Sequence, residues 1–290
     1  MWLPASGCNL RATLESGQTF RWRPWGPWGT RGVVGGTVVT LVQHGSLLAV
    51  GGSADEETLA ALVARYLRLE DEHAAWWRTV EVDPLIRAAL CATRGLRIVR
   101  QDPWECLASF ICASFNHIKR IEGMIERLCR AYGRAVPYRG EIWFTFPDAA
   151  TLARADAGAL RRLGFGYRAP YVVRAAQQVA SGQVELAAVA RLPYLEAREV
   201  LLQVEGVGDK VVECVLLFGF GQVEAFPVDV WISRVMRALY FRGRRVPDRR
   251  IREFARRHFG RACGLAQQAL YHAARTCPDV FDVPIGGRDA

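Results

Sequence analysis

The segment that decides the fold of this chain is Leu202–Trp231, LQVEGVGDKVVECVLLFGFGQVEAFPVDVW. A helix-like run ends at Glu205, and a second apolar run with helical spacing begins at Val211. Gly206-Val207-Gly208 stands between them, and glycine permits the positive φ angles and close backbone approach that a tight turn needs. The segment therefore predicts a helix–hairpin–helix with Lys210 in the first turn of the second helix.

Lys210 is an unusual residue for that position. Lys119 and Lys210 are the two lysines among 38 basic residues, so the other 36 are arginines. A cation is disfavoured at the positive end of a helix dipole. Unlike arginine, lysine can lose its proton and then act as a nucleophile that forms Schiff bases. Lys210 is therefore a candidate catalytic amine, although a lysine in the first turn of a helix is more often only solvated.

A carboxylate follows this lysine in the segment FPVDVW. Asp229 precedes the apolar run Ile232, Val235, Met236 and Leu239, which favours a role as helix N-cap. An N-cap carboxylate can also face a cleft. Asp229 is therefore a second candidate for catalysis.

The rest of the chain changes pattern once. Glycine-rich turns and β-prone pieces such as Thr37–Val42 and Leu47–Val50 predict an antiparallel sheet with hairpins. From residue 82 onward, amphipathic runs predict a series of helices, and the tail from Pro278 is expected to be extended. We therefore expect an α+β fold with an N-terminal antiparallel sheet subdomain (1–81) and a helical helix–hairpin–helix domain (82–290). The expected helices are Glu56–Leu69, Glu105–Ser114, Ile118–Tyr132, Asp156–Leu163, Ala169–Ser181, Tyr194–Val204, Asp248–Phe259 and Ala262–Thr276.

Composition indicates which kind of partner the protein binds and where in the cell it acts. The 290 residues are 51% hydrophobic, enough for a sizeable core, and the net charge of +9 suits a polyanion such as nucleic acid. No apolar run reaches the ~20 residues of a membrane span, and the N-terminus lacks a signal-peptide pattern. We expect a soluble intracellular protein, in the cytoplasm or nucleoid, or in the nucleus of a eukaryote.

Cysteine usage indicates thiols in a reducing compartment. The eight cysteines form no Cys-x-x-Cys pair, which argues against zinc or thioredoxin-like chemistry. The last stretch offers Cys263 and Cys277 alone, too few for a C-terminal four-cysteine iron–sulfur cluster. Most of these cysteines fall in apolar helical patterns and are expected in the core.

Several blocks of the sequence resemble the 8-oxoguanine DNA glycosylase/AP lyases, helix–hairpin–helix DNA glycosylases with a catalytic lysine. The blocks are GVGDK with VDV, SGQTFRW (16–22), QDPWEC (101–106), SFIC (109–112), GYR (166–168) and AQ (266–267). They occur in the family's order and cover most of the chain, whereas GVG alone would be a weak signal. The resemblance implies excision of 8-oxoguanine from double-stranded DNA in base excision repair. It also implies a monomer that needs neither a metal nor an organic cofactor.

The resemblance also implies roles for individual residues. Lys210 would attack the sugar C1′ and form a Schiff base that leads to β-elimination, and Asp229 would stabilise the positive charge on the sugar. The carbonyl of Gly17 would accept the N7 hydrogen that 8-oxoguanine has and guanine lacks. Gln267 would read the Watson–Crick edge, with Cys214 and Tyr271 on the two faces of the base. Their ordinary alternatives are a turn for Gly17, core packing for Cys214 and a surface amide for Gln267.

Other matching positions would hold the DNA. The backbone N–H groups of Gly206, Val207 and Gly208 would bind a phosphate. Positions expected to fill the gap that the flipped-out base leaves and to contact the orphaned cytosine are Phe115, Asn116, Arg120, Tyr167 and Arg168. The ordinary alternative for Tyr167 and Arg168 is a buried loop tyrosine with a surface arginine.

Three departures from the family pattern stand out. Phe115 and His117 replace asparagines, and Trp231 replaces a histidine that contacts a phosphate. Phe115 can stack in the gap but cannot hydrogen-bond cytosine, so we expect relaxed discrimination of the opposite base.

Two other interpretations are open on the sequence. One is a related glycosylase for alkylated or other oxidised bases, although those that rely on aspartate alone lack the lysine. The other is a non-catalytic helix–hairpin–helix DNA-binding module, which would explain the hairpin and the charge but not Lys210 with Asp229.

Overall fold

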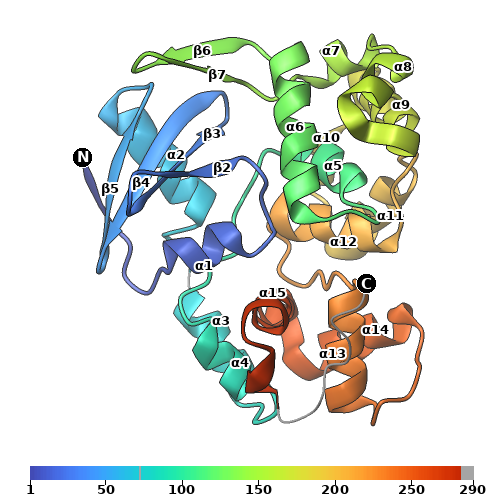
Figure 1. Ribbon diagram of the computed structural model, residues 1–290. Helices are drawn as coiled ribbons and strands as arrows, with labels where there is room; N and C mark the ends of the chain where they lie inside the picture. Colours follow the sequence, from blue (N-terminus) through green and yellow to red (C-terminus); the bar gives the residue numbers. More distant parts are fainter. Residues whose placement is uncertain (72, 282–290) are drawn as a thin grey trace.

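The N-terminal part of the protein is built on a five-stranded antiparallel sheet (Figure 1). The computed structural model describes residues 1–71 and 73–281. The four strands between residues 22 and 52 pair consecutively as hairpins, with Gly32 opposite Val39 and Leu41 opposite Val50, while the strand at residues 2–4 pairs with the one at 47–52. The expected antiparallel sheet is confirmed. In spatial order its strands are β1 (Trp2–Pro4), β5 (Leu47–Gly52), β4 (Thr37–His44), β3 (Gly29–Val34) and β2 (Trp22–Trp25).

Helix α2 (Glu56–Leu67) packs beside this sheet and shares its core. Its N-cap is Asp55, whose Oδ1 accepts a hydrogen bond from the Thr58 N–H at 2.9 Å. The helix ends two residues before the expected Leu69 because Arg68 takes a left-handed conformation with φ +52°. Between β1 and β2 the chain also forms the short helix α1 (Leu10–Glu15).

Two buried helices form the centre of the second part. In α12 (Asp209–Phe218) every residue from Val211 onward is buried, and α5 (Pro103–Cys112) packs against it. The expected succession of helices is confirmed. The others are α3 (His73–Val80), α4 (Arg87–Ala92), α6 (Ile118–Tyr132), α7 (Ala149–Ala153), α8 (Ala157–Leu160), α9 (Ala169–Ala180), α10 (Leu186–Val189), α11 (Tyr194–Leu202), α13 (Val230–Tyr240), α14 (Asp248–Phe259) and α15 (Cys263–Thr276).

Three stretches differ from the expectation. A two-stranded hairpin, β6 (Ala135–Tyr138) and β7 (Glu141–Phe144), interrupts the helices because Arg139 and Gly140 both take positive φ, as a tight hairpin turn requires. The expected helix 156–163 gives way after Leu160 to a wide turn, in which Gly164 has φ +96°. Pro278–Val280 forms a 3₁₀ turn instead of an extended tail, and residues 282–290 lie outside the described part.

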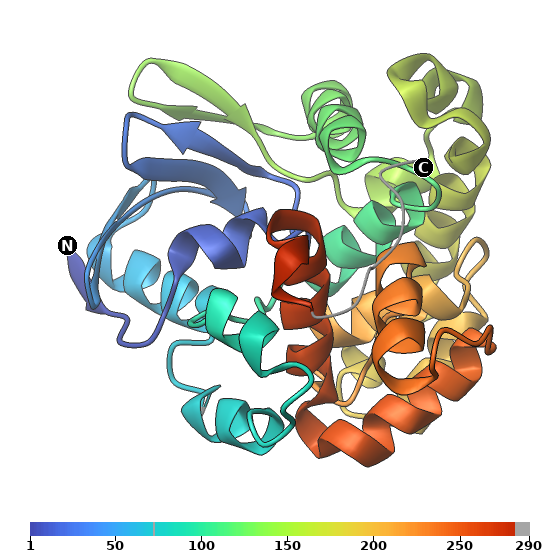
Figure 2. The same ribbon diagram turned by 60° about the horizontal axis from the view of Figure 1, so that its bottom comes forward.

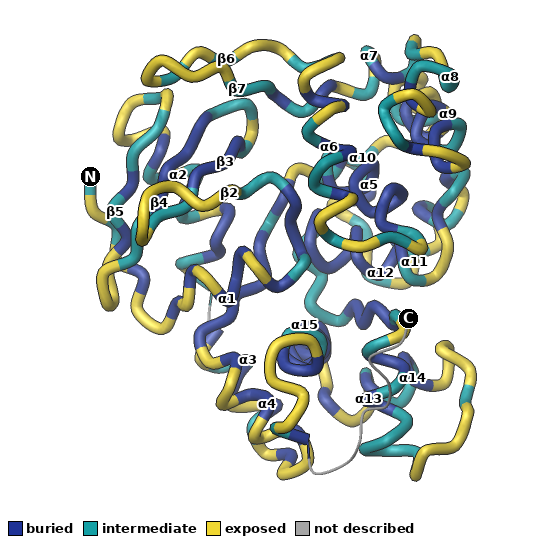
Figure 3. Tube along the Cα trace, viewed as in Figure 1, coloured by how far each residue is buried: buried dark blue, intermediate teal, exposed yellow. Residues whose placement is uncertain are grey.

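The two parts interlock around α15. This helix packs against α3, α4 and α13 (Figure 2), and its residues from Cys263 to Leu270 are all buried (Figure 3). Gln268 Nε2 donates to the carbonyl of Ser16, 2.8 Å away, just after α1. The C-terminal helix is thereby tied to the N-terminal segment. The boundary between residues 81 and 82 stays a prediction.

Candidate active site

The hairpin between α11 and α12 has the expected form. Gly206 has φ +86°, and a Cβ at this position would lie 2.6 Å from Cβ of Tyr171 on α9. A side chain is therefore excluded by both conformation and space. Val207 is buried and anchors the turn, while Gly208 is the extended N-cap of α12 and faces open space. The helix–hairpin–helix and the place of Lys210 in the first turn of α12 are confirmed.

Lys210 does not extend into bulk water. It is half-buried, and its Nζ lies over the ring of Phe110 on α5, 5.6 Å from the centroid. Phe110 is itself fixed between Phe20 and Phe218, at centroid distances of 5.4 and 5.6 Å. The amine is thus held on a rigid aromatic surface that joins the two parts of the molecule.

Asp229 is both an N-cap and a neighbour of Lys210. Its Oδ1 accepts a hydrogen bond from the N–H of Ile232 at 2.8 Å, which caps α13. Burial raises the pKa of Asp229 above its ordinary 3.8, and the positive charges of Lys210 and Arg275 oppose that rise. The capping prediction is confirmed, and the same carboxylate lies within electrostatic range of the amine.

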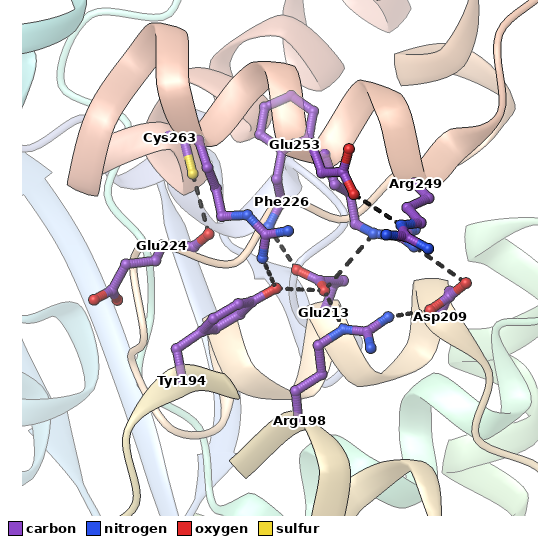
Figure 4. Close-up of polar contacts among 11 residues, drawn as sticks. Tyr194, Arg198, Asp209, Glu213, Glu224, Phe226, Arg249, Glu253 and Cys263 are labelled. Carbon is purple, nitrogen blue, oxygen red and sulfur yellow. Dashed lines mark hydrogen bonds and ion pairs between the residues drawn. The ribbon is translucent and has the colours of Figure 1, made fainter. Parts of the chain in front are cut away.

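A buried carboxylate behind the site fixes α12 in place (Figure 4). Glu213, one turn after Lys210, is fully buried and accepts hydrogen bonds from Tyr194 Oη (2.6 Å) and Arg198 Nε (2.9 Å). Its second oxygen accepts from the backbone N–H of Phe226 at 2.8 Å. Because Phe226 lies three residues before Asp229, Glu213 links the helix of the lysine to the segment of the aspartate.

Ion pairs extend this network to the N-terminus of α12. Asp209 pairs with Arg198 of α11 and with Arg252 of α14, the latter at 3.1 Å. Arg256 of α14 reaches Tyr194 at 2.5 Å. Two neighbouring helices, α11 and α14, therefore hold the turn that carries Lys210.

One face of α15 supplies the expected base-binding residues. Gln267 is 4% exposed, and its Oε1 has no hydrogen-bond partner among the described residues. Tyr271 follows one turn later, on the same side of the helix. A buried acceptor without a partner is costly unless a ligand supplies the missing donor. The surface-amide alternative for Gln267 is therefore wrong.

Cys214 and Asp229 reach the same region from α12 and α13. Burial raises the pKa of Cys214 to about 12, so the thiol stays protonated. The positive charge of Lys210 opposes the rise in the pKa of Cys214. Burial is the main cause of the raised pKa of Tyr271, and Asp229 and Cys214 both raise it further. The four side chains therefore form one cluster.

Gly17 faces this cluster from the N-terminal part. It has φ +78°, and a Cβ at Gly17 would lie 3.3 Å from Cε1 of Tyr271 and 2.9 Å from Cδ1 of Ile118. The neighbouring Gln18 is fully buried and fixes the loop, since it donates to Arg97 O (2.8 Å) and accepts from Gln101 Nε2 (2.7 Å) through its carbonyl. The structure thus brings Gly17 beside Tyr271, two residues that the resemblance assigns to one base pocket.

A second surface lies on the loop between α5 and α6. Phe115 is 98% exposed and has φ +49°, an unfavourable conformation for a bulky residue. Arg168 holds this loop, because its Nε donates to Ser114 O (2.8 Å) and its Nη2 to Phe115 O (3.0 Å). Tyr167 is half-exposed and lies against the Arg168 guanidinium at 4.4 Å. Two exposed aromatic rings therefore project from one braced pair of loops.

The other residues expected to contact the orphaned cytosine differ in their exposure. Arg168 is 5% exposed and is engaged with protein carbonyls, so the surface-arginine alternative is wrong. Asn116 is half-buried, and its amide donates to Cys112 O at 3.3 Å. Arg120 is exposed in the first turn of α6.

Sequence reasoning missed two members of the site. Glu213 had a signal, because it is the one charged residue in the apolar run 211–218, and a buried charge needs partners. Arg275 had a weaker signal, one helical step after Tyr271 in the last turn of α15.

Comparison with known proteins agrees with this arrangement. Residues 2–107 match the family described as 8-oxoguanine DNA glycosylase, N-terminal domain, and residues 108–260 match the HhH-GPD superfamily of base excision DNA repair proteins. A probable N-glycosylase/DNA lyase of Methanothermobacter thermautotrophicus is 32% identical, covering 95% of this chain and 96% of the relative.

Two solved structures share the whole fold. MBOgg1 in complex with a low-affinity DNA ligand is 33% identical with a TM-score of 0.91, covering 94% of both chains. The 8-oxoguanine glycosylase/lyase of Clostridium acetobutylicum, in complex with duplex DNA containing cytosine opposite 8-oxoguanine, is 28% identical with a TM-score of 0.89. That match covers 95% of this chain and 97% of the other.

The fold and the hairpin site define a DNA glycosylase with lyase activity. The chain belongs to the HhH-GPD superfamily of base excision DNA repair proteins and, within it, to the 8-oxoguanine DNA glycosylase family. A helix long and apolar enough to cross a bilayer is absent from residues 1–71 and 73–281.

Proposed function

We propose that this chain excises 8-oxoguanine from duplex DNA and then cuts the strand, with Lys210 as nucleophile and Asp229 as its electrostatic partner. The observation that carries the proposal is that the half-buried Lys210 lies over Phe110 within electrostatic range of Asp229, while Gly17 lies beside Tyr271. An amine beside a carboxylate, next to a planar aromatic side chain, suits attack on a nucleoside whose base has been flipped out of the duplex.

The reaction follows from the chemistry of the amine. Unprotonated Lys210 attacks C1′, and the electron pair of the C1′–N9 bond leaves with the base. The surplus proton of the new secondary amine goes to the departing base. Asp229 stabilises the positive charge that develops on the sugar. Ring opening gives a Schiff base, after which loss of a C2′ proton expels the 3′ phosphate by β-elimination.

Base selection rests on the groups opposite the amine. The Gly17 carbonyl accepts the N7 hydrogen of 8-oxoguanine, whereas guanine would present a lone pair to it. Tyr271 and Cys214 cover the two faces of the base. The unpartnered Oε1 of Gln267 accepts a hydrogen bond from the Watson–Crick edge.

DNA binding uses both the hairpin and the aromatic loops. The N–H groups of Gly206, Val207 and Gly208 contact a phosphate next to the positive end of α12. Phe115 and Tyr167 stack in the gap that the flipped-out base leaves. The phenyl ring of Phe115 cannot form a hydrogen bond with the opposite base. We therefore propose relaxed opposite-base discrimination, and an enzyme that acts as a monomer inside the cell.

Borohydride trapping on a duplex with a single 8-oxoguanine tests the mechanism. The wild-type chain is expected to form a covalent adduct and Lys210→Arg to form none, because a guanidinium cannot lose its proton to become the nucleophile. Lys119→Arg is the matched control, since it removes the other lysine, which is 92% exposed and paired with Glu122. It is expected to trap like the wild type.

Two outcomes would contradict the proposal. Strand cleavage or trapping by Lys210→Arg would remove the lysine from the mechanism. Wild-type binding without any adduct or base release would instead favour the non-catalytic DNA-binding module.

A further inference from the structure

Arg275 stands at one edge of the proposed base pocket. It lies in the last turn of α15, and its guanidinium carbon is 5.2 Å from the centroid of the Tyr271 ring. Its Nη1 would be 3.4 Å from a Cβ on Gly17. Arg275 also acts electrostatically on Asp229. The guanidinium thus lies beside Gly17 and Tyr271, within electrostatic range of Asp229.

The spacing along α15 tells which end of the base Arg275 faces. Gln267, Tyr271 and Arg275 succeed one another at four-residue steps, and each step advances about 6 Å along a helix. A purine that stacks on Tyr271 with its Watson–Crick edge toward Gln267 directs its five-membered ring toward Arg275. The C8 oxygen is on that ring, next to the N7 hydrogen that faces Gly17.

We propose that Arg275 donates a hydrogen bond to the C8 oxygen of the flipped-out base and stabilises the charge that the base acquires as it leaves. This inference rests on the proposed function. As Lys210 bonds to C1′, the electron pair of the C1′–N9 bond moves onto the base, and part of that charge resides on the C8 oxygen. A guanidinium donor aimed at this oxygen is therefore strengthened in the transition state.

The contact would add a second discriminator against guanine. Guanine carries a C8 hydrogen in place of the oxygen and cannot accept from Arg275. Together, the Gly17 carbonyl and the Arg275 guanidinium would match the adjacent donor and acceptor that oxidation creates at N7 and C8. A DNA phosphate is the competing ligand for an arginine at this place, and it would respond differently to the test.

The test compares two reactions that differ only in the presence of the base. One is single-turnover release of 8-oxoguanine from a duplex, and the other is cleavage of a duplex with a preformed abasic site. Arg275→Leu is expected to slow base release by about 10- to 100-fold. Loss of one hydrogen-bond donor to a transition-state oxyanion usually slows a reaction by about 100- to 1000-fold, so the expected loss is at the lower end of that range or below it. Abasic-site cleavage and the Kd for a tetrahydrofuran-containing duplex should change less than about 2-fold, since neither involves the base.

Two further variants make the result interpretable. Arg275→Lys is expected to restore part of the rate of base release, because the charge returns without the guanidinium geometry. Arg257→Leu is the matched control, since it removes an exposed arginine near the end of α14. It should leave both reactions unchanged, and melting curves establish that all three variants fold.

Other outcomes would contradict either the role of Arg275 or the proposed function. An equal loss in both reactions, with a raised Kd, would assign Arg275 to a phosphate and overturn the proposal, as would unchanged base release. A wild-type chain that cleaves abasic DNA but releases no 8-oxoguanine would refute the proposed function itself. Normal wild-type release with an equally fast Arg275→Leu would refute only the role of Arg275.

Discussion

Glu213→Gln is expected to destabilise the protein strongly and to impair catalysis without touching the substrate. The change keeps the size of the side chain but removes a charge that faces Arg198 at 2.9 Å and Arg252 at 4.0 Å. The substitution also replaces one carboxylate oxygen of Glu213 by an NH₂ group. That group would face either the donors Tyr194 and Arg198 or the N–H of Phe226.

The magnitude follows from breaking a buried ion pair while its partner stays charged. Such changes cost about 3–5 kcal/mol. The lower figure corresponds to a fall in Tm of roughly 6–12 °C at the 2–4 °C per kcal/mol seen for domains somewhat smaller than this chain. Because Glu213 joins the helix of Lys210 to the segment of Asp229, single-turnover base release below the melting transition should also fall, by up to about 100-fold for a displacement of ~1 Å.

Calorimetry and base-release kinetics check both parts against a matched control. Glu253→Gln also neutralises a glutamate paired with an arginine, Arg249 at 2.8 Å, but that pair is exposed (Figure 4). It should leave Tm and rate unchanged, as exposed pairs contribute little. A Glu213→Gln protein that melts and reacts like the wild type would refute the reasoning.

Three further predictions concern the pocket and the gap. Gly17→Ala should lower base release and cost about 1–3 kcal/mol of stability, since alanine is strained at φ +78° and its Cβ would lie 2.9 Å from Ile118; an unchanged rate and Tm would contradict this. Phe115→Asn should create a preference for cytosine opposite the lesion and should not destabilise the loop, because asparagine tolerates φ +49°; equal rates opposite cytosine, adenine and thymine in the variant would count against it. Burial raises the pKa of Asp229, and its carboxylate is the form that acts in the proposed mechanism; base release should therefore fall on the acid side with a midpoint above pH 3.8, and Asp229→Asn should be slow with this acid limb missing from its pH–rate profile.

Strong local periodicity explains what the sequence predicted well. Ile118–Tyr132 and Asp248–Phe259 begin and end where expected, because each has a continuous apolar stripe. The hairpin glycines and the Asp229 cap were recognisable because turns and caps depend on nearest neighbours.

Short patterns and long-range contacts account for what the sequence did not predict. The β6–β7 hairpin depends on four-residue strands and the Arg139-Gly140 turn, too short a pattern to stand out among helices. Glu213 and Arg275 acquire their roles from residues on other elements, and no spacing rule connects them. The burial of Arg168 could not be predicted, because the sequence does not reveal that carbonyls of the α5–α6 loop accept hydrogen bonds from its guanidinium.

The hydrogen bond from Gln268 to Ser16 joins positions 252 residues apart. In the proposed mechanism, recognition of an oxidised base would therefore require the segment that carries Gly17 and helix α15 to have come together. A nascent chain interrupted before α15 would carry the reactive amine but neither Gln267 nor Tyr271. Under the proposed function, synthesis itself would delay selective attack on DNA until α15 has docked.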